Sequence, residues 1–295
     1  MKIRTDFELE IIEVKSKSKR YKNPLLFVHG ACHGAWCWQE NYMPFFAEQG
    51  WDCIALNLRG HGNSQGRDQL DQFGLDDYVT DVLNVLERRG ISPILIGHSM
   101  GGGIAQLLMT KHPEAISGVV LLASMPPGWV SFIEFLRFFR YPSGCMAMQR
   151  LMAGKRTTSK GIHQSPFFSK RISENQANTY LSLLQPESER ALLDMHEMQT
   201  EGGQQPFPLM VLGSKKDYLF GEKALNKTAK HYLTDAIILK EGCHDLMLDP
   251  NWLQSAEYIV SWLVRSYVEM NEHDFNGEMH RKSNSVTSTS VALRV

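Results

Sequence analysis

The chain has 295 residues, of which 43% are hydrophobic and 21% are charged, and its formal net charge at pH 7 is −1. This length fits one large domain or two small ones, and the apolar content is sufficient for a sizeable core. A net charge so close to zero gives no electrostatic basis for binding nucleic acid or an anionic membrane. We therefore expect no nucleic-acid partner.

Five cysteines are scattered along the chain without a Cys-x-x-Cys pair. Their odd number and irregular spacing favour reduced thiols over a disulfide framework. The first residues lack the apolar core of a signal peptide, and no apolar run is long enough to span a bilayer. These features predict a cytoplasmic protein and leave its oligomeric state open.

Apolar runs alternate with helical spacing through the first part of the chain. Residues 7–14 alternate in polarity as one strand does, and continuous apolar runs predict buried parallel strands at 24–28, 53–56, 94–96 and 116–123. Apolar residues at helical spacing predict helices at 78–89 and 104–111. Strands that alternate with helices are typical of βαβ units and predict a parallel sheet.

The alternation stops at Pro126, returns with strands at 208–213 and 236–239, and closes with an amphipathic helix at 251–270. The intervening segment has an irregular helical pattern, and the last residues are rich in Asn, Ser and Thr. We predict a mostly parallel, doubly wound α/β sheet with an inserted helical lid. The predicted parts are a core at 1–125 and 206–270, a lid at 126–205 and a disordered tail at 271–295.

The motif Gly97-His98-Ser99-Met100-Gly101 lies where a predicted strand meets a predicted helix. Gly-x-Ser-x-Gly in this context is the nucleophile elbow, a strained turn that exposes a serine above a sheet. The alternative is a glycine-rich turn without chemistry. The elbow interpretation requires partners for the serine elsewhere in the chain.

A serine nucleophile needs a histidine base that a carboxylate orients, and in this architecture the order along the chain is Ser, acid, His. Asp217 follows the strand at 208–213, and His244 follows the strand at 236–239. Catalytic groups of open α/β sheets gather beyond the carboxyl ends of strands. We therefore predict a triad of Ser99, Asp217 and His244.

Several other residues could be assigned instead, and each has a simpler explanation. Asp245 is adjacent to His244, which favours a capping or supporting role, and Asp249 precedes Pro250 as a helix N-cap does. The histidines that we expect to pack or to lie at the surface are His98, His112 and His231.

Two backbone N–H groups are predicted to hold the oxyanion of a tetrahedral intermediate. One belongs to Met100, directly after the nucleophile, and the other to Ala31, in the loop after the strand at 24–28. We expect His29 to support this loop by hydrogen bonding. The sequence has no clustered Cys/His spacing and no Walker or Gly-x-Gly-x-x-Gly motif, so we expect no metal and no cofactor.

The lid is dense in aromatic residues, and we predict that Trp129, Phe132 and Phe135 bind substrate. An apolar mouth of this kind would suit a lipid chain and could make transient contact with a membrane surface, with Arg137 and Arg140 at the headgroups. The alternative is that these aromatic residues form the core of the lid itself.

These motifs resemble those of α/β-hydrolases over residues 7–268. The oxyanion loop at 29–38 is similar to that of plant methylesterases and hydroxynitrile lyases. The motifs at 211–217 and 241–249 are similar to those of chlorophyll dephytylases and of lysophospholipase- or monoacylglycerol lipase-like hydrolases. The resemblance implies hydrolysis of a bulky, lipophilic ester.

We therefore predict a cofactor-independent serine hydrolase that cleaves a small-molecule carboxylic ester through an acyl-enzyme on Ser99. One alternative is a receptor-like binding protein with the same fold, because fold alone does not prove turnover. Another is a lyase or C–C hydrolase that uses the same triad. Haloalkane dehalogenases and epoxide hydrolases are disfavoured because they place Asp where Ser99 stands.

Overall fold

The computed structural model describes residues 7–128 and 167–267. A seven-stranded sheet runs through it in the order β1-β3-β2-β4-β5-β6-β7, with β1 antiparallel to β3 and every other neighbouring pair parallel. The strands are β1 (Ile11–Val14), β2 (Leu25–Val28), β3 (Cys53–Leu56), β4 (Ile94–His98), β5 (Gly118–Leu122), β6 (Leu209–Ser214) and β7 (Ala236–Leu239). The predicted mostly parallel α/β sheet is confirmed.

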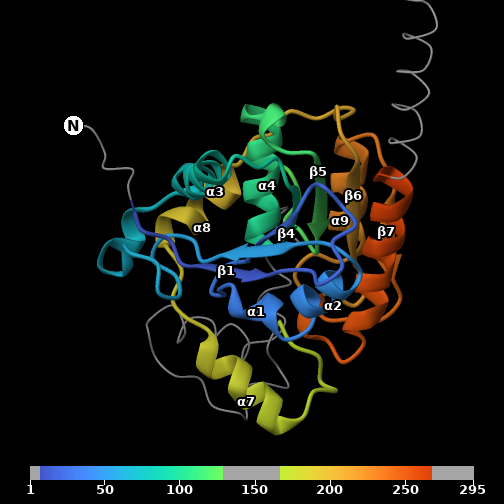
Figure 1. The fold of residues 1–295 in the computed structure, drawn as a ribbon. Helices are drawn as coiled ribbons and strands as arrows, with labels where there is room; N and C mark the ends of the chain where they lie inside the picture. Colours follow the sequence, from blue (N-terminus) through green and yellow to red (C-terminus); the bar gives the residue numbers. More distant parts are fainter. Residues whose placement is uncertain (1–6, 129–166, 268–295) are drawn as a thin grey trace, which may run out of the picture. The chain divides into compact units, whose positions relative to one another are not determined.

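Helices cover both faces of this sheet (Figure 1). They are α1 (Trp36–Gln39), α2 (Tyr42–Glu48), α3 (Leu75–Arg89), α4 (Met100–Lys111), α7 (Glu174–Leu183), α8 (Glu189–Glu197) and α9 (Glu222–His231), with 3₁₀ turns η1 (Arg67–Gln72), η2 (Pro113–Ala115) and η4 (Leu246–Leu248). A further helix begins at 252 and is described to 267. Helix α9 has no counterpart among the predicted elements.

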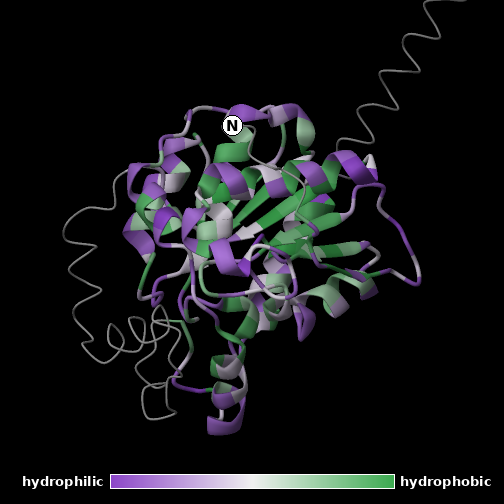
Figure 2. Ribbon diagram, turned by 90° about the vertical axis from the view of Figure 1, so that its left-hand side faces the viewer, coloured by the Kyte–Doolittle hydropathy of each residue, from purple (hydrophilic) through white to green (hydrophobic). Residues whose placement is uncertain are grey.

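The period-two alternation of side chains in β2 assigns the two faces. Leu26 and Val28 belong to the core cluster that contains the apolar residues of α3 and α4. Phe27, between them in sequence, packs instead on Trp38 and Phe46 from α1 and α2, at ring-centroid distances of 5.1 and 5.9 Å. Because both faces are covered, β2 is apolar throughout and fully buried, and Figure 2 shows the central strands in the hydrophobic colour.

Several element boundaries differ from the predicted ones, those of β1 and α3 among them. Strand β1 pairs over residues 11–14 and not over the whole of 7–14. Helix α3 begins at Leu75, three residues before the predicted start, because the Asp77 carboxylate accepts a hydrogen bond from Gly74 N at 2.8 Å and caps an earlier turn. The same helix ends as predicted at Gly90, whose φ of 59° is left-handed.

The predicted lid falls partly outside the described residues. Its described portion, 167–205, contains α7 and α8, whereas Trp129, Phe132 and Phe135 lie in the undescribed segment. The contacts divide the chain into two units, residues 1–256 and 257–295, of which the second is described only as the helical residues 257–267. Among all described residues, no helix combines the length and the apolar character needed to cross a bilayer.

Strand β2 lies between β3 and β4, so the connections that leave it and return to the sheet run in opposite directions. Such a topological switch point opens a crevice beyond the carboxyl ends of the two central strands. The loop after β2 and the turn after β4 both begin at this edge. The candidate site therefore forms where the fold favours ligand binding.

Candidate active site

Ser99 lies in the turn between β4 and α4, in a conformation that L-residues rarely adopt. Its φ is 52° and its ψ is −115°. The surrounding backbone holds it: Ser99 N donates to Leu122 O at 3.2 Å, and Ser99 O accepts from Gly102 N at 3.0 Å. Strain of this kind costs about 1–3 kcal/mol and persists only where neighbours overdetermine the backbone. The predicted elbow geometry is therefore present.

The glycines on either side of Ser99 permit two close backbone approaches. A Cβ on Gly97 would lie 2.4 Å from Gly101 O, and a Cβ on Gly101 would lie 2.3 Å from Val28 O. Both distances are far below van der Waals contact, so these positions exclude any side chain. The same reasoning places Gly30 against the nucleophile, because its Cβ would lie 2.9 Å from Ser99 Cβ.

Asp217 and His244, which are 27 residues apart in sequence, meet in a buried hydrogen bond. His244 Nδ1 lies 2.9 Å from Asp217 Oδ2, while Asp217 Oδ1 accepts hydrogen bonds from the backbone N–H groups of Leu219 and Phe220 at 2.8 and 3.1 Å. These donors fix the orientation of the carboxylate. An ionised carboxylate can only accept hydrogen bonds, so the proton of His244 lies on Nδ1. His244 Nε2 is buried and has no hydrogen-bond partner among the described residues, which leaves it able to accept a proton.

The oxyanion loop, residues 29–35, is held by hydrogen bonds to its carbonyl groups. Gly30 O accepts from His29 Nδ1 at 2.9 Å and from His33 N at 3.3 Å. A trans peptide directs its N–H opposite to its C=O, so these bonds fix the Ala31 N–H on the other side of the Gly30–Ala31 peptide. Met100 begins α4, where the first N–H groups of a helix have no intrahelical acceptor. Met100 directly follows Ser99, and Ala31 directly follows Gly30, whose hypothetical Cβ lies against Ser99.

A segment that returns from the lid region fastens to the same loop; we refer to residues 185–188 as the strap. Gln185 N donates to Cys32 O at 3.0 Å, and Gln185 Nε2 donates to His33 O at 2.6 Å. The buried Glu187 carboxylate accepts from Cys32 N at 3.2 Å and pairs with His61 at 3.0 Å. Burial opposes ionisation of Glu187, but His61 and the hydrogen bonds outweigh it and lower the pKa of Glu187 to about 2.

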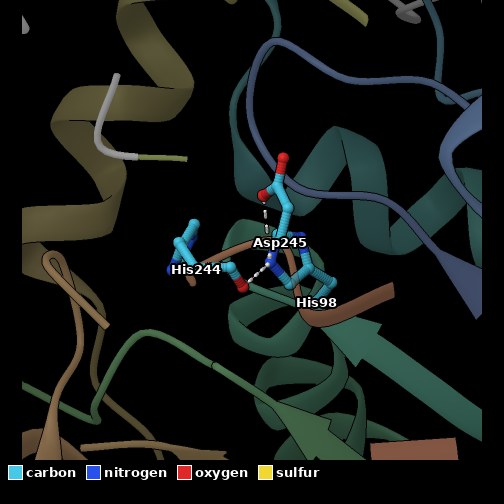
Figure 3. A group of neighbouring side chains, drawn as sticks. All are labelled: His98, His244 and Asp245. Atoms are coloured by element: carbon cyan, nitrogen blue, oxygen red, sulfur yellow. Dashed lines mark hydrogen bonds and ion pairs between the residues drawn. The ribbon is translucent and has the colours of Figure 1, made fainter. Parts of the chain in front are cut away.

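A second buried network surrounds the histidine loop, residues 241–249. His98 Nε2 lies 3.1 Å from His244 O and 3.6 Å from Asp245 Oδ1, as Figure 3 shows. Asp245 Oδ2 lies 2.8 Å from His33 Nε2. Burial, and then the neighbouring His244, lower the pKa of His98 to about 3, so that its ring is neutral.

His98, His244 and Asp245 also bring candidate metal-ligand atoms within 4.8 Å of one another. A cation bound to His98 Nε2 would displace its hydrogen bond to His244 O, and one bound to His244 Nδ1 would displace Asp217. One nitrogen of each of these two imidazoles is therefore already used in a hydrogen bond.

Comparison with known families agrees with this arrangement of strand, elbow and loops. Residues 23–250 match the family described as alpha/beta hydrolase fold. The chain belongs to this family. The α/β-hydrolase resemblance expected from the sequence motifs is thus confirmed.

Relatives of this α/β-hydrolase share a limited segment with it. Methylesterase 9 of Arabidopsis thaliana is 36% identical over 119 residues, 38% of this chain and 45% of that protein. Norfluorocurarine synthase 1 of Strychnos nux-vomica is 37% identical over 115 residues, 37% of this chain and 41% of that protein. The chain therefore spans less than half the length of these curated relatives. An esterase from Exiguobacterium antarcticum has the same fold, with a TM-score of 0.70 at 17% identity over 87% of this chain and 95% of that one.

The other candidate residues of this α/β-hydrolase have structural roles. Asp249 Oδ1 accepts from Asn251 N at 2.8 Å, as an N-cap does, and Asp249 Oδ2 also accepts from Cys243 N at 3.0 Å. His112 lies at the surface near Glu114. His29 supports the oxyanion loop as expected. Asp245 caps no helix through its side chain, so the supporting role is the one that the geometry favours.

Aromatic rings lie beside the His244 imidazole and beside the neighbouring His33. Phe220 and Phe167 lie 5.6 and 6.1 Å from it by ring centroids, and the Trp36 ring stacks on His33 at 5.5 Å and on Tyr180 at 6.0 Å. A separate cavity of about 950 Å³, lined by Phe7, Phe73 and residues 64–69 among others, touches none of the three triad residues. His244 therefore has aromatic neighbours in Phe167 and Phe220 and polar neighbours in Asp217 and His98, and that cavity belongs to another part of the surface.

His33, Asp245 and Glu187 are the buried polar residues whose partners sequence reasoning missed. Their contacts with one another, with Cys32 and with His61 span 126 to 212 residues along the chain, and no local pattern encodes such a pairing. A weak signal was present, since His33 lies in the loop whose motif resembles methylesterases and Asp245 directly follows His244.

Proposed function

We propose that the protein is a carboxylic ester hydrolase in which Ser99 is the nucleophile, His244 the general base and Asp217 the group that orients His244. One observation carries the proposal. A serine in the strained elbow lies at the same sheet edge as a buried His244 whose Nδ1 is bonded to Asp217 and whose Nε2 has no partner among the described residues.

In the acylation half-reaction, Ser99 Oγ attacks the ester carbonyl carbon while His244 Nε2 takes the hydroxyl proton. The carbonyl oxygen becomes an oxyanion that accepts hydrogen bonds from Ala31 N–H and Met100 N–H. The His244 imidazolium, stabilised by Asp217, then gives its proton to the alkoxide leaving group. The alcohol departs, and the acyl group remains on Ser99.

Deacylation repeats these steps with water as the nucleophile. His244 takes a proton from water as it attacks the acyl carbon, and it returns that proton to Ser99 Oγ when the tetrahedral intermediate collapses. The products are a carboxylic acid and the free serine. Every proton that moves passes through His244 Nε2, so the chemistry needs no cofactor.

A lipophilic ester is the substrate class that the surroundings favour. Phe167 and Phe220 flank His244, and Trp36 and Tyr180 extend the aromatic surface away from it. Apolar rings favour a hydrocarbon group over a charged one. The substrate-binding roles of Trp129, Phe132 and Phe135, and the lid at 126–205, stay part of this proposal.

The test combines turnover with active-site labelling. The wild-type protein should hydrolyse p-nitrophenyl esters and take up one equivalent of a fluorophosphonate probe, and Ser99→Ala should lose both while keeping its circular dichroism spectrum. Retained turnover in Ser99→Ala would remove Ser99 as the nucleophile. An ester panel graded in acyl and alcohol length tests the substrate class, and preference for short, water-soluble esters would contradict the lipophilic assignment.

The same measurements separate the competing functions. A receptor-like protein would bind the panel esters without turnover, and a lyase would cleave a cyanohydrin or a C–C bond with Ser99 present. A relative named as a synthase is among those similar to this chain, so non-ester substrates are measured beside the ester panel.

A further inference from the structure

The buried network beside His244 links three loops of the proposed active site: the oxyanion loop, the elbow and the histidine loop. Its centre is Asp245, fully buried, in the histidine loop. Its partner His33 belongs to the oxyanion loop, and its neighbour His98 belongs to the elbow, one residue before Ser99. Residues 212 positions apart in sequence therefore meet at one carboxylate.

The contacts of His33 define its charge. Nε2 lies 2.8 Å from the Asp245 carboxylate, and Nδ1 lies 2.8 Å from Ala31 O. A carbonyl oxygen can only accept a hydrogen bond, and so can an ionised carboxylate, so both ring nitrogens must donate. Burial alone would lower the pKa of His33, but the attraction of Asp245 outweighs it and raises the pKa above its usual value. The same pairing lowers the pKa of Asp245 against the opposing effect of burial.

The His33 ring holds the residue that carries the proposed oxyanion donor. Ala31 N–H belongs to the Gly30–Ala31 peptide, and Ala31 O belongs to the next one. Gly30 O is fixed by His29 and by His33 N, and Ala31 O is fixed by His33 Nδ1. The two peptides on either side of the Ala31 Cα are thus both held, and His33 contributes to each.

The other end of the network holds the catalytic base. His98 Nε2 donates to His244 O at 3.1 Å, so the residue next to Ser99 fixes the backbone of His244. Asp245 follows His244 directly in the chain. Hydrogen bonds and covalent bonds therefore form a continuous path from Ala31 through His33, Asp245, His244 and His98 to the elbow. Figure 3 shows the part of this path that Asp245, His244 and His98 form.

We propose that the buried His33–Asp245 ion pair is a positioning device that holds the Ala31 N–H in register with Ser99 and His244. This inference rests on the proposed function. Neither residue touches the reacting atoms, and both act through the oxyanion loop. Because the oxyanion exists only in the transition state and intermediate, loss of the pair should lower kcat and leave KM nearly unchanged.

Two variants remove the pair while keeping the shape of the site. Asp245→Asn preserves side-chain volume and removes the charge. His33→Phe keeps an aromatic ring between Trp36 and Phe167, which contact the His33 ring at 5.5 and 5.2 Å, and removes both donors. We expect each variant to lower kcat about 10- to 100-fold, somewhat less than removal of a whole oxyanion donor, with KM within about threefold of wild type.

Because the two residues act as one pair, the double variant should be about as impaired as either single variant. Affinity for a trifluoromethyl ketone, which forms a tetrahedral adduct, should fall in parallel with kcat/KM, whereas affinity for the product alcohol should not change. If the fold-losses in kcat of the two single variants multiply in the double variant, or if KM rises at constant kcat, the proposal is overturned.

Asp81→Asn is the matched control for loss of a buried ion pair, since the Asp81 carboxylate bonds Arg59 at 2.6 Å and contacts none of the three loops. It should lower the melting temperature without changing kcat. If Asp245→Asn and His33→Phe also keep kcat within about twofold of wild type while they destabilise the fold, the pair is structural and the proposal fails.

Proton NMR of protein with ¹⁵N-labelled histidine reads the pair without turnover. Wild type should show two slowly exchanging, downfield imidazole N–H signals that are both lost in His33→Phe, and at least one of these two should shift upfield in Asp245→Asn. Loss of only one such signal in His33→Phe would contradict the charged pair. If the wild-type protein is neither labelled nor active, the hydrolase proposal fails, and this signal still reports on the ion pair by itself.

Discussion

At the scale of single residues, the conformation of Ser99 distinguishes a working elbow from a simple turn. A serine with φ of 52° and ψ of −115° is held in place by the packing of Gly97 and Gly101, and the strain is part of what brings its side chain against Gly30. Glycine tolerates positive φ without this cost. The strain can therefore be measured by removing the side chain.

We predict that the free energy of unfolding of Ser99→Gly is about 1 kcal/mol higher than that of Ser99→Ala. Glycine adopts this positive φ without strain, whereas alanine does not. Urea unfolding of the two variants measures the difference. Ala105→Gly in α4 makes the same Ala-to-Gly change at a helical φ and should destabilise by at least about 1 kcal/mol, because it also removes a buried methyl group. A lower stability for Ser99→Gly than for Ser99→Ala would show that the elbow is unstrained.

Some contacts between single residues could be predicted from the sequence, and others could not. Ser99, Asp217 and His244 each follow a predicted strand, and in a parallel sheet those positions share one edge, so their proximity could be predicted. The partner of Asp245 could not, because a buried ion pair with His33 depends on how two loops meet in space. The catalytic roles of Ser99, Asp217 and His244 stay predictions that the labelling and kinetic experiments test.

At the scale of elements, α4 approaches β2 so closely that backbone meets backbone. The hypothetical Cβ of Gly101 faces Val28 O, which cannot move without breaking the central sheet. Further along the same helix, a Cβ on Gly103 would lie 2.6 Å from Met125 Sδ, on a flexible side chain. Gly101 therefore carries a backbone constraint that Gly103, two residues further along α4, lacks.

Gly101→Ala should accordingly destabilise the protein by about 3 kcal/mol through overpacking against Val28 O. Gly103→Ala should stay within about 1 kcal/mol of wild type, because Met125 can adopt another rotamer and alanine favours the helix. Chemical unfolding of both variants provides the comparison. Equal losses at the two positions would contradict a clash confined to the helix start.

The element pattern was predictable where strands and helices alternate, and less so where tertiary contacts decide. Apolar runs identify β2 to β7, and β2 to β6 are buried because strands covered on both faces must be apolar, whereas the edge strand β7 is only partly buried. The start of α3 was missed because the capping interaction of Asp77 with Gly74 lies outside the apolar pattern. No sequence pattern predicts the strap at 185–188, because the strap is defined by its hydrogen bonds to the oxyanion loop.

At the scale of the whole molecule, the buried histidines make stability depend on pH. Burial, and then the neighbouring His61, lower the pKa of His29 to about 3, and burial lowers that of His98 to about 3 as well. In the unfolded chain a histidine titrates near 6.5. Between these values the unfolded state binds more protons than the folded state, so acidification below about pH 6.5 must reduce stability.

His29→Gln isolates one of these contributions, because the amide can still donate to Gly30 O and accept from Leu58 N as the imidazole does. Near pH 5 the wild-type free energy of unfolding should fall by about 1.4 kcal/mol per pH unit for each neutral buried histidine. The slope for His29→Gln should be shallower by that amount. Urea unfolding between pH 4 and 7 measures both slopes.

His112→Gln, at an exposed histidine, should leave the slope unchanged. If the wild-type and His29→Gln slopes coincide, His29 is protonated in the folded protein, and its hydrogen bond to Leu58 N must be abandoned, because a charged imidazole has no free lone pair to accept it.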